Sequence, residues 1–162
     1  LAIGLLPHLK AGFFQRRLFS QSYACLMRRG HRLDKKRISL SEFSSAEHLV
    51  VVSAGTGHGK VDELLERSGV DRTIRLTVPH YVSVGHILQA TDLIATVPDR
   101  LADRLVEPFG LVKVPHPAKL PDVAINVFWH AKYHRASANR WLRGILFELF
   151  ADAPPSAAPK RP

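Results

Sequence analysis

The sequence predicts an α/β fold, with helices layered on mostly parallel sheets. Short apolar runs bounded by turn residues alternate along the chain with amphipathic segments, and this alternation is typical of such folds. The clearest case is residues 49–69, where an apolar run meets the glycine-rich stretch GTGHG and an amphipathic segment follows. The chain has 162 residues, 46% of them hydrophobic, which suits one ordinary globular domain.

Strands dominate the predicted first half. Ser39 with Glu42 forms a capping box, so a short helix is expected to start there. A second helix is expected over 60–68, with Val61, Leu64 and Leu65 on its inner face and Gly69 as its C-cap. The strands are expected at 1–6 (buried), 13–20, 22–28 (buried) and 48–53 (buried).

The second half continues the alternation. Ser83 is expected to cap a helix over 83–90, and Asp99 a helix over 100–106. A last helix is expected over 137–150, with an apolar stripe that includes Trp141 and Leu149. Strands are expected at 73–78, 93–97, 111–114 and 123–129. The Pro/Ala-rich residues 151–162 are expected to be disordered.

Composition narrows the class of protein. No apolar run approaches 18 residues, so no membrane span is expected, and the single Cys25 suits a reducing, cytoplasmic compartment. The net charge of +9 gathers partly in residues 28–37, which lack the interleaved aromatics of a single-strand binder and are expected to form a solvated face. The first residue is Leu1, and LAIGLL resembles a strand already under way. We therefore expect a fragment whose N-terminal part is missing.

The glycine-rich turn at 55–60 is the main candidate site. Its spacing fits neither a phosphate loop nor a dinucleotide fingerprint. A strand that leads through glycines into a helix N-terminus still offers free N–H groups and a positive dipole end to a polar or anionic ligand. His58 adds a hydrogen-bonding group, although a tight turn with a solvated histidine explains the same residues.

Two further strand-to-helix corners follow. His80 and Tyr81 can face a cleft, or Tyr81 can belong to the core. Arg100 falls in a first helical turn, against the helix dipole, so a bound carboxylate can compensate it. The alternative is a surface arginine paired with Asp99 or Asp103. Ligands of α/β folds bind at the carboxyl ends of strands, where these corners lie.

Catalysis and metal binding find little support. The nine histidines form no cluster with metal-ligand spacing, Cys25 lies in an apolar strand, and no serine sits in a nucleophile elbow. We expect no enzyme, no metal and no cofactor.

Three long motifs carry a resemblance to a known family. They are RRLFSQSYACLMRRGHRL at 16–33, VPHYVSVGHILQATDLIATVPDRLADRLVEPFGL at 78–111 and FWHAKYHRASANRWLR at 128–143. In order and spacing they resemble the effector-binding domain of LysR-type transcriptional regulators. With GTGHG at 55–59, the chain resembles the branch that regulates degradation of naphthalene, salicylate and nitroaromatics, the NahR/NagR/DntR-like regulators. The resemblance covers residues 1 to about 150.

The resemblance implies a periplasmic-binding-protein-like type 2 fold, two lobes joined by two crossovers. Lobe one would comprise 1–20 and 128–150 and be incomplete, and lobe two would comprise 22–125. The family's effector, here a small aromatic carboxylate such as salicylate, sits between the lobes and shifts a homotetramer on promoter DNA. The DNA-reading helix-turn-helix would lie upstream. Contact of the full-length protein with RNA polymerase is compatible with the same resemblance.

The resemblance also implies effector-binding residues, by position. His58 matches a cleft histidine, with Thr56 and Gly57 beside it, and Arg100 matches an arginine near the effector. Gln21 falls where relatives often carry histidine, and this departure bears on the identity of the inducer. The remaining expected contacts are Phe19, Tyr81 and Ile125. Alternatives from other classes are a stand-alone solute-binding protein of the same fold and, on the glycine turn alone, a phosphate-transferring enzyme.

Overall fold

The computed structural model describes residues 1–6, 11–52, 59–67 and 69–151. They belong to two compact units. The first unit comprises Leu1–Ser20 and Val123–Pro162, and the second comprises Gln21–Asp122. The chain therefore passes from the first unit to the second after Ser20 and returns after Asp122.

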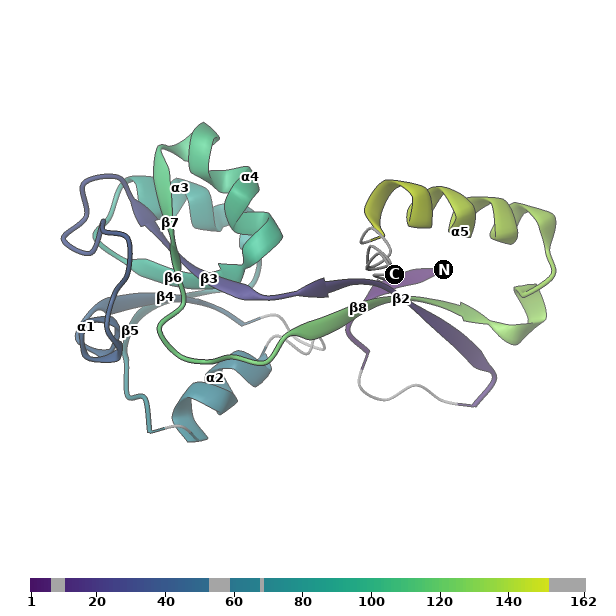
Figure 1. Ribbon diagram of the computed structural model, residues 1–162, viewed down its shortest axis with the longest axis horizontal. Helices are drawn as coiled ribbons and strands as arrows, with labels where there is room; N and C mark the ends of the chain where they lie inside the picture. Colours follow the sequence, from purple (N-terminus) through teal and green to yellow (C-terminus); the bar gives the residue numbers. More distant parts are fainter. Residues whose placement is uncertain (7–10, 53–58, 68, 152–162) are drawn as a thin grey trace, which may run out of the picture. The chain divides into compact units, whose positions relative to one another are not determined.

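The second unit is a five-stranded sheet with helices on both faces. Its strand order is β5-β4-β6-β3-β7. Helices α3 and α4 cover one face, and α1 and α2 cover the other (Figure 1). The strands are β3 (Tyr23–Arg28), β4 (Glu47–Val51), β5 (Thr73–Val78), β6 (Ile94–Pro98) and β7 (Leu111–Pro115). The helices are α1 (Leu40–Ser44), α2 (Gly59–Arg67), η1 (Tyr81–Ser83), α3 (Val84–Gln89) and α4 (Asp99–Phe109).

The strand directions in this sheet are mixed. Strand β4 is parallel to β5 and β6, whereas β3 runs antiparallel to both β6 and β7. The expectation of mostly parallel sheets is therefore wrong. The reason is the chain path: β3 continues from β2 of the first unit rather than through a helical crossover, so its direction is not tied to that of β4–β6.

The core of the second unit lies on both sides of the central strands. All but the last residue of β3 are buried, as predicted for 22–28. On the α3–α4 face, Leu26, Leu49, Leu88 and Val97 belong to one buried apolar cluster. On the other face, Phe43 of α1 is fully buried.

Helix ends confirm part of the sequence prediction. The Ser39–Glu42 capping box is present at the start of α1. After α2, Gly69 adopts φ +69°, and the Val70 N–H donates to the Leu65 carbonyl at 2.9 Å. This is the left-handed helix terminus that glycine permits. The hydrogen bond from the Val70 N–H to the Leu65 carbonyl provides a partner for one of the free carbonyls at the end of the helix.

Ser83 occupies the N-cap position of α3, as predicted, but its hydroxyl makes no capping bond and donates instead to the His80 carbonyl at 3.1 Å. The remaining predicted cap is wrong. Asp99 is the first residue of α4, whose N-cap position is Pro98. The Asp99 carboxylate pairs with Lys113 at 3.2 Å, so a cation on the neighbouring strand replaces the expected backbone donor.

The basic segment after β3 forms a solvated face, as expected. His31, Leu33 and Ile38 are buried and anchor the segment, while the arginines and lysines at 29, 32 and 35–37 are exposed. The His31 ring accepts the Leu33 N–H through Nδ1 and donates through Nε2 to the Asp92 carbonyl. The segment is therefore held in place by its buried members.

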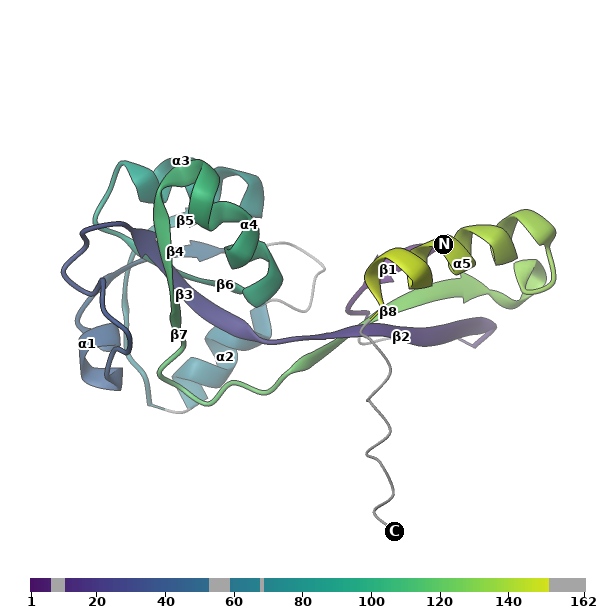
Figure 2. The same ribbon diagram turned by 45° about the horizontal axis from the view of Figure 1, so that its top comes forward.

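The first unit is a small sheet with one long helix over it (Figure 2). The strand order is β1-β8-β2, with β1 (Ala2–Gly4), β2 (Phe13–Gln21) and β8 (Val123–His130). After η2 (Ala131–Tyr133), helix α5 (Ser137–Phe150) packs Leu146 and Phe147 on a cluster of Leu18, Val127 and Trp129. Strand β2 reaches into the second unit with its last residue, Gln21.

Burial in the first unit differs from the prediction. Strand β1 is expected to be buried, yet Ile3 is 50% exposed because β1 pairs only with β8, along one edge. Trp141 and Leu149, placed in the inward stripe of α5, are 68% and 66% exposed. No described helix in either unit is long and apolar enough to span a bilayer.

Candidate functional site

The carboxyl ends of three parallel strands meet at one edge of the second unit. Strands β4, β5 and β6 end at Val51, Val78 and Pro98, and the Val52 N–H donates to the Val78 carbonyl at 3.0 Å. At the same edge, Tyr23 of β3 lies opposite Pro98 in the β3–β6 register. The strand-to-helix corners identified in the sequence therefore begin from neighbouring positions.

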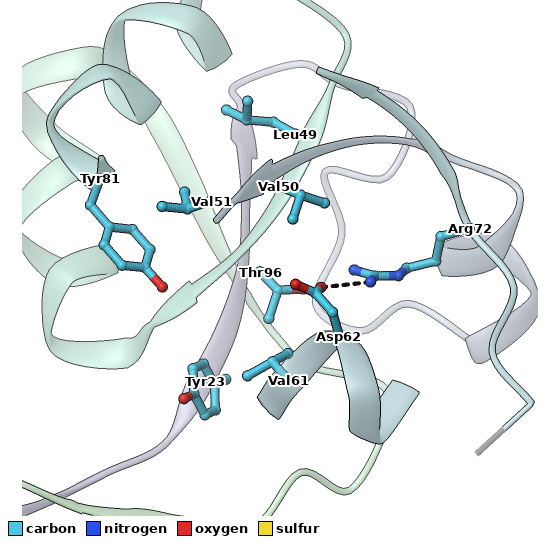
Figure 3. Close-up of a pocket in the computed structure, with 9 residues that line it drawn as sticks. All are labelled: Tyr23, Leu49, Val50, Val51, Val61, Asp62, Arg72, Tyr81 and Thr96. Atoms are coloured by element: carbon cyan, nitrogen blue, oxygen red, sulfur yellow. Dashed lines mark hydrogen bonds and ion pairs between the residues drawn. The ribbon is translucent and has the colours of Figure 1, made fainter. Parts of the chain in front are cut away.

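A small pocket opens beside this edge. Figure 3 shows its lining: two phenol rings, an ion pair and apolar side chains of β4, with a threonine of β6 behind them. Its cavity volume is about 10 Å³, which is room for about one water-sized group. The lining residues are Tyr23, Leu49, Val50, Val51, Val61, Asp62, Arg72, Tyr81 and Thr96.

An ion pair fixes the start of α2 to the rest of the second unit. Asp62, in the first turn of α2, accepts a hydrogen bond from Arg72 at 2.7 Å. The Arg72 side chain is 5% exposed and that of Asp62 25%. Removing one partner of such a pair leaves a charge without compensation in a poorly hydrated place. The pair therefore holds α2 in register with the segment that precedes β5.

Two tyrosines with neutral phenols line the pocket. Tyr23 is 9% exposed, and its hydroxyl oxygen is buried without a hydrogen-bond partner among the described residues. Burial raises the pKa of Tyr23, and the negative charge of Asp62 raises it further. Burial likewise raises the pKa of Tyr81, followed by smaller effects of Tyr23 and Asp62. Both phenols therefore remain protonated at neutral pH.

A buried histidine, His48, and a half-buried one, His116, lie in the same unit. The His48 ring donates through Nε2 to the Phe43 carbonyl at 2.9 Å, and its Nδ1 is buried without a partner in the described part of the chain. His116 contacts Thr96 Oγ1 at 3.2 Å, and Phe43 packs edge-on against both rings. Burial lowers the pKa of each imidazole to about 4. Both are neutral at pH 7.

Cys25 is buried and unreactive, as the sequence interpretation expects. Burial raises the pKa of the Cys25 thiol to about 12, so the reactive thiolate is suppressed. Among the residues that the structure describes, no group of three or more histidine, cysteine or carboxylate side chains is arranged to hold a metal ion.

Three predicted site residues lie at or beside the carboxyl edge. Tyr81 begins η1, lines the pocket and also packs against the apolar cluster, so it has core contacts, and its role in effector binding stays a prediction. Gln21 is 5% exposed, and its side-chain amide donates to the Ser22 carbonyl at 2.8 Å. Arg100 is exposed in the first turn of α4. Asp99 and Asp103, the partners suggested for it, each also pair with Lys113, and Arg100 has an interaction of its own.

Two further predicted site residues, Phe19 and Ile125, do not line this pocket. Phe19 and Ile125 belong to the first unit, where Phe19 packs against the Leu18 cluster and Ile125 is 8% exposed. Thr56, Gly57 and His58 lie outside the described residues.

Of the residues that line the pocket, the sequence analysis singles out only Tyr81 as a site residue, and it leaves out Tyr23, Asp62 and Arg72 among others. In the sequence Tyr23 is one more member of a buried strand, and Asp62 is a polar residue of a predicted helix. Arg72 stands in a short connection without any periodic signal. One sequence feature does point to Asp62. It lies in the first turn of the helix that follows the glycine-rich stretch, so its carboxylate is expected to lie near that corner.

Comparison with protein families identifies the group to which the chain belongs. Residues 1–151 match the family model described as the LysR substrate binding domain. The chain belongs to this family. The resemblance found in the motifs is thereby confirmed, and it extends over nearly the whole chain.

Curated relatives agree with this assignment. The chain is 58% identical over 152 residues to the HTH-type transcriptional activator NahR of Pseudomonas putida. The aligned region covers 94% of this chain and 51% of NahR. It is 58% identical over 153 residues to NagR of a Ralstonia species, with the same coverage. This LysR-family chain therefore spans about half the length of the relatives it matches. They are regulators and not enzymes, as the sequence prediction expects of this chain.

A solved structure supports the fold. The regulatory domain of MexT, a transcriptional activator in Pseudomonas aeruginosa, superimposes with a TM-score of 0.77 at 28% identity, over 91% of this chain and 72% of MexT's. The periplasmic-binding-protein-like type 2 fold expected for a LysR effector-binding domain is confirmed.

Proposed function

We propose that this chain is the ligand-sensing part of a LysR-type transcriptional regulator and that its effector is a small aromatic carboxylate such as salicylate. The observation that supports this most strongly is the 58% identity to two named transcriptional activators over 94% of the chain. The class of effector follows from the motif resemblance to regulators of salicylate and naphthalene degradation.

The effector is proposed to bind at the carboxyl edge of β4–β6. Strand ends of parallel α/β sheets are where ligands of such folds bind. Arg100 stands at this edge at the start of α4, and its guanidinium can pair bidentately with a carboxylate. His58, Thr56 and Gly57 are proposed to contact the same ligand, on the resemblance alone, and Phe19 and Ile125 to provide apolar contacts.

Binding is proposed to shift the populations of two conformations of a DNA-bound oligomer. A ligand shifts such an equilibrium only as far as its affinities for the two states differ. We further propose that the full-length protein binds promoter DNA as a homotetramer and contacts RNA polymerase. The alternative of a stand-alone solute-binding protein gains no support from the relatives, which are named as transcriptional regulators.

Calorimetry on the full-length regulator with salicylate tests the proposal. Arg100→Ala and His58→Ala are each expected to weaken binding about ten- to a hundredfold, because each removes a hydrogen bond to a charged group. Arg104→Ala is the matched control, since Arg104 is exposed one turn later on α4. Unchanged affinity in both site variants would refute the site, and no heat of binding in the wild-type protein would refute the effector class.

A further inference from the structure

The basic segment, residues 28–38, joins β3 to α1 as a loop that is anchored from within (Figure 1). Its His31 and Leu33 side chains are buried. The Asp34 carboxylate accepts a hydrogen bond from the Gly30 N–H at 2.8 Å, and the Asp34 N–H donates to the His31 carbonyl at 2.8 Å. These bonds close a compact turn, so the charged side chains of the segment extend from a defined backbone.

Half of the cations in this segment are left without a partner. Two of its six cations are in ion pairs, Arg28 with Asp92 at 2.6 Å and Lys35 with Glu42. A third, Arg32, donates to a backbone carbonyl at 3.1 Å. The other three side chains are exposed and make no hydrogen bond or ion pair with the described residues; they are those of Arg29, Lys36 and Arg37.

The carboxylates around the segment do not cancel this positive charge. Arg29 and Lys36 line one groove together with Asp34, Asp103 and Glu107. Asp103 is already paired with Lys113. The six cations of the segment therefore have four carboxylates as neighbours among the described residues, and the local charge stays positive. These carboxylates are Asp34, Glu42, Asp92 and Glu107.

The exposed chemistry of the segment fits the backbone of duplex DNA better than a protein surface. Its apolar members, Leu33 and Ile38, are buried, so it presents no apolar or aromatic centre of the kind on which protein–protein interfaces depend. Protein–DNA interfaces are more polar and much more positively charged. Cations that extend from an anchored loop can contact phosphate oxygens without reading any base.

We propose that the basic segment is an additional DNA-contacting surface of the full-length regulator, at which Arg29, Lys36 and Arg37 bind phosphate groups of duplex DNA. This inference rests on the proposed function, which gives the full-length protein a DNA ligand. The contacts position the second unit against the duplex and add affinity without adding sequence specificity.

The salt dependence of DNA binding by the full-length regulator tests this surface. Fluorescence anisotropy with a labelled duplex of random sequence measures the association constant between about 50 and 200 mM salt. Each phosphate contact contributes about 0.9 to the slope of log affinity against log salt concentration. The triple variant Arg29→Gln, Lys36→Gln and Arg37→Gln is therefore expected to bind more weakly and to lower the magnitude of the slope by about 2 to 3.

Two further triple variants are the controls. The first removes three exposed cations elsewhere in the chain: Arg104→Gln, Lys119→Gln and Arg135→Gln. Its slope is expected to differ from that of the wild type by less than about 1. The second keeps every charge of the segment, and it is expected to bind DNA as the wild type does: Arg29→Lys, Lys36→Arg and Arg37→Lys. A titration with poly-glutamate, run in parallel, measures binding of an acidic polypeptide.

The possible failures are distinguishable. An equal loss of slope in both glutamine variants would show that only the overall charge matters, and it would overturn the surface. An unchanged slope in the segment variant would overturn it too, and loss of poly-glutamate binding in that case would assign the segment to an acidic protein partner. A wild-type regulator that binds no duplex even at low salt would refute the proposed function itself.

Discussion

Several polar side chains in the second unit are largely buried. Tyr23, His48 and the Asp62–Arg72 pair all lie where water is scarce, and two of these residues keep a polar atom without a partner. Polar groups of this kind lower stability unless they have another use. For His48 the consequence is that the stability of the fold depends on pH.

His48 is expected to make the fold sensitive to acid. Burial lowers its pKa from 6.5 to about 4, so the folded protein binds this proton less readily than the unfolded chain. Stability is therefore fully present above pH 6.5 and is lost as the pH falls toward 4, by an amount on the order of 2–3 kcal/mol. Urea unfolding at pH 7 and pH 5, followed by circular dichroism, measures this loss.

A substitution isolates the contribution of His48. In His48→Gln the loss of stability between pH 7 and pH 5 is expected to be smaller, because the amide does not titrate. His86→Gln, at an exposed ring on α3, is expected to leave the loss unchanged. His116 has a similarly lowered pKa, so part of the pH dependence stays in the His48 variant. Equal pH dependence in wild type and His48→Gln would contradict the assignment.

At the scale of elements, close packing between α3 and α4 depends on one glycine. A Cβ built on Gly85 would lie 2.5 Å from the Phe109 ring, a distance that no ordinary contact allows. Gly85→Ala is therefore expected to lower the free energy of unfolding by about 1–3 kcal/mol, as overpacking does. Gly144 on α5 has no atom within 4 Å of the same position. Gly144→Ala is expected to raise stability by about 0.5–1 kcal/mol through helix propensity.

Denaturant unfolding of the two variants measures both predicted changes in the free energy of unfolding, the decrease for Gly85→Ala and the increase for Gly144→Ala. The substitution is the same in each case, and both glycines lie in helices, so propensity alone predicts stabilisation at both positions. Stabilisation by Gly85→Ala would show that Phe109 moves aside without cost. A destabilised Gly144→Ala would show that α5 packs more closely than its exposure indicates.

Most elements were predictable because their signals are local. The Ser39–Glu42 box and Gly69 each fix a helix end through bonds to residues within one or two turns. The failures involve distant partners. Asp99 pairs with Lys113 on another strand, and β3 runs antiparallel because of the strand that precedes it, neither of which a local pattern can show.

The candidate site divides in the same way. Tyr81 was found because corners after strands are easy to recognise in a sequence. Tyr23 was missed because it meets the corner only through its register with Pro98, far along the chain. Arg100 is proposed from its place in a first helical turn and from the family resemblance, whereas neither source indicates Tyr23, Asp62 or Arg72.

At the scale of the whole molecule, exposed apolar side chains are distributed unevenly. Among the described residues, the first unit exposes most of the large ones. Its buried cluster there consists of Leu18, Val127 and Trp129. The exposed set there includes Ile3 at 50%, Phe13 at 45%, Phe14 at 44%, Trp141 at 68% and Leu149 at 66%. Exposed apolar surface of this kind marks a contact with another protein surface or a site of aggregation.

The 162-residue chain, expressed by itself, is therefore expected to self-associate through the first unit. Size-exclusion chromatography with light scattering is expected to show species larger than the 18.1 kDa monomer. Trp141→Lys combined with Leu149→Lys is expected to shift the distribution toward monomer, because two charges then lie on the exposed side of α5. Ile74→Lys with Val82→Lys, at exposed positions of the second unit, is the matched control and is expected to change little. A monomeric wild-type chain, or an equal effect of both pairs, would contradict an interaction surface on the first unit.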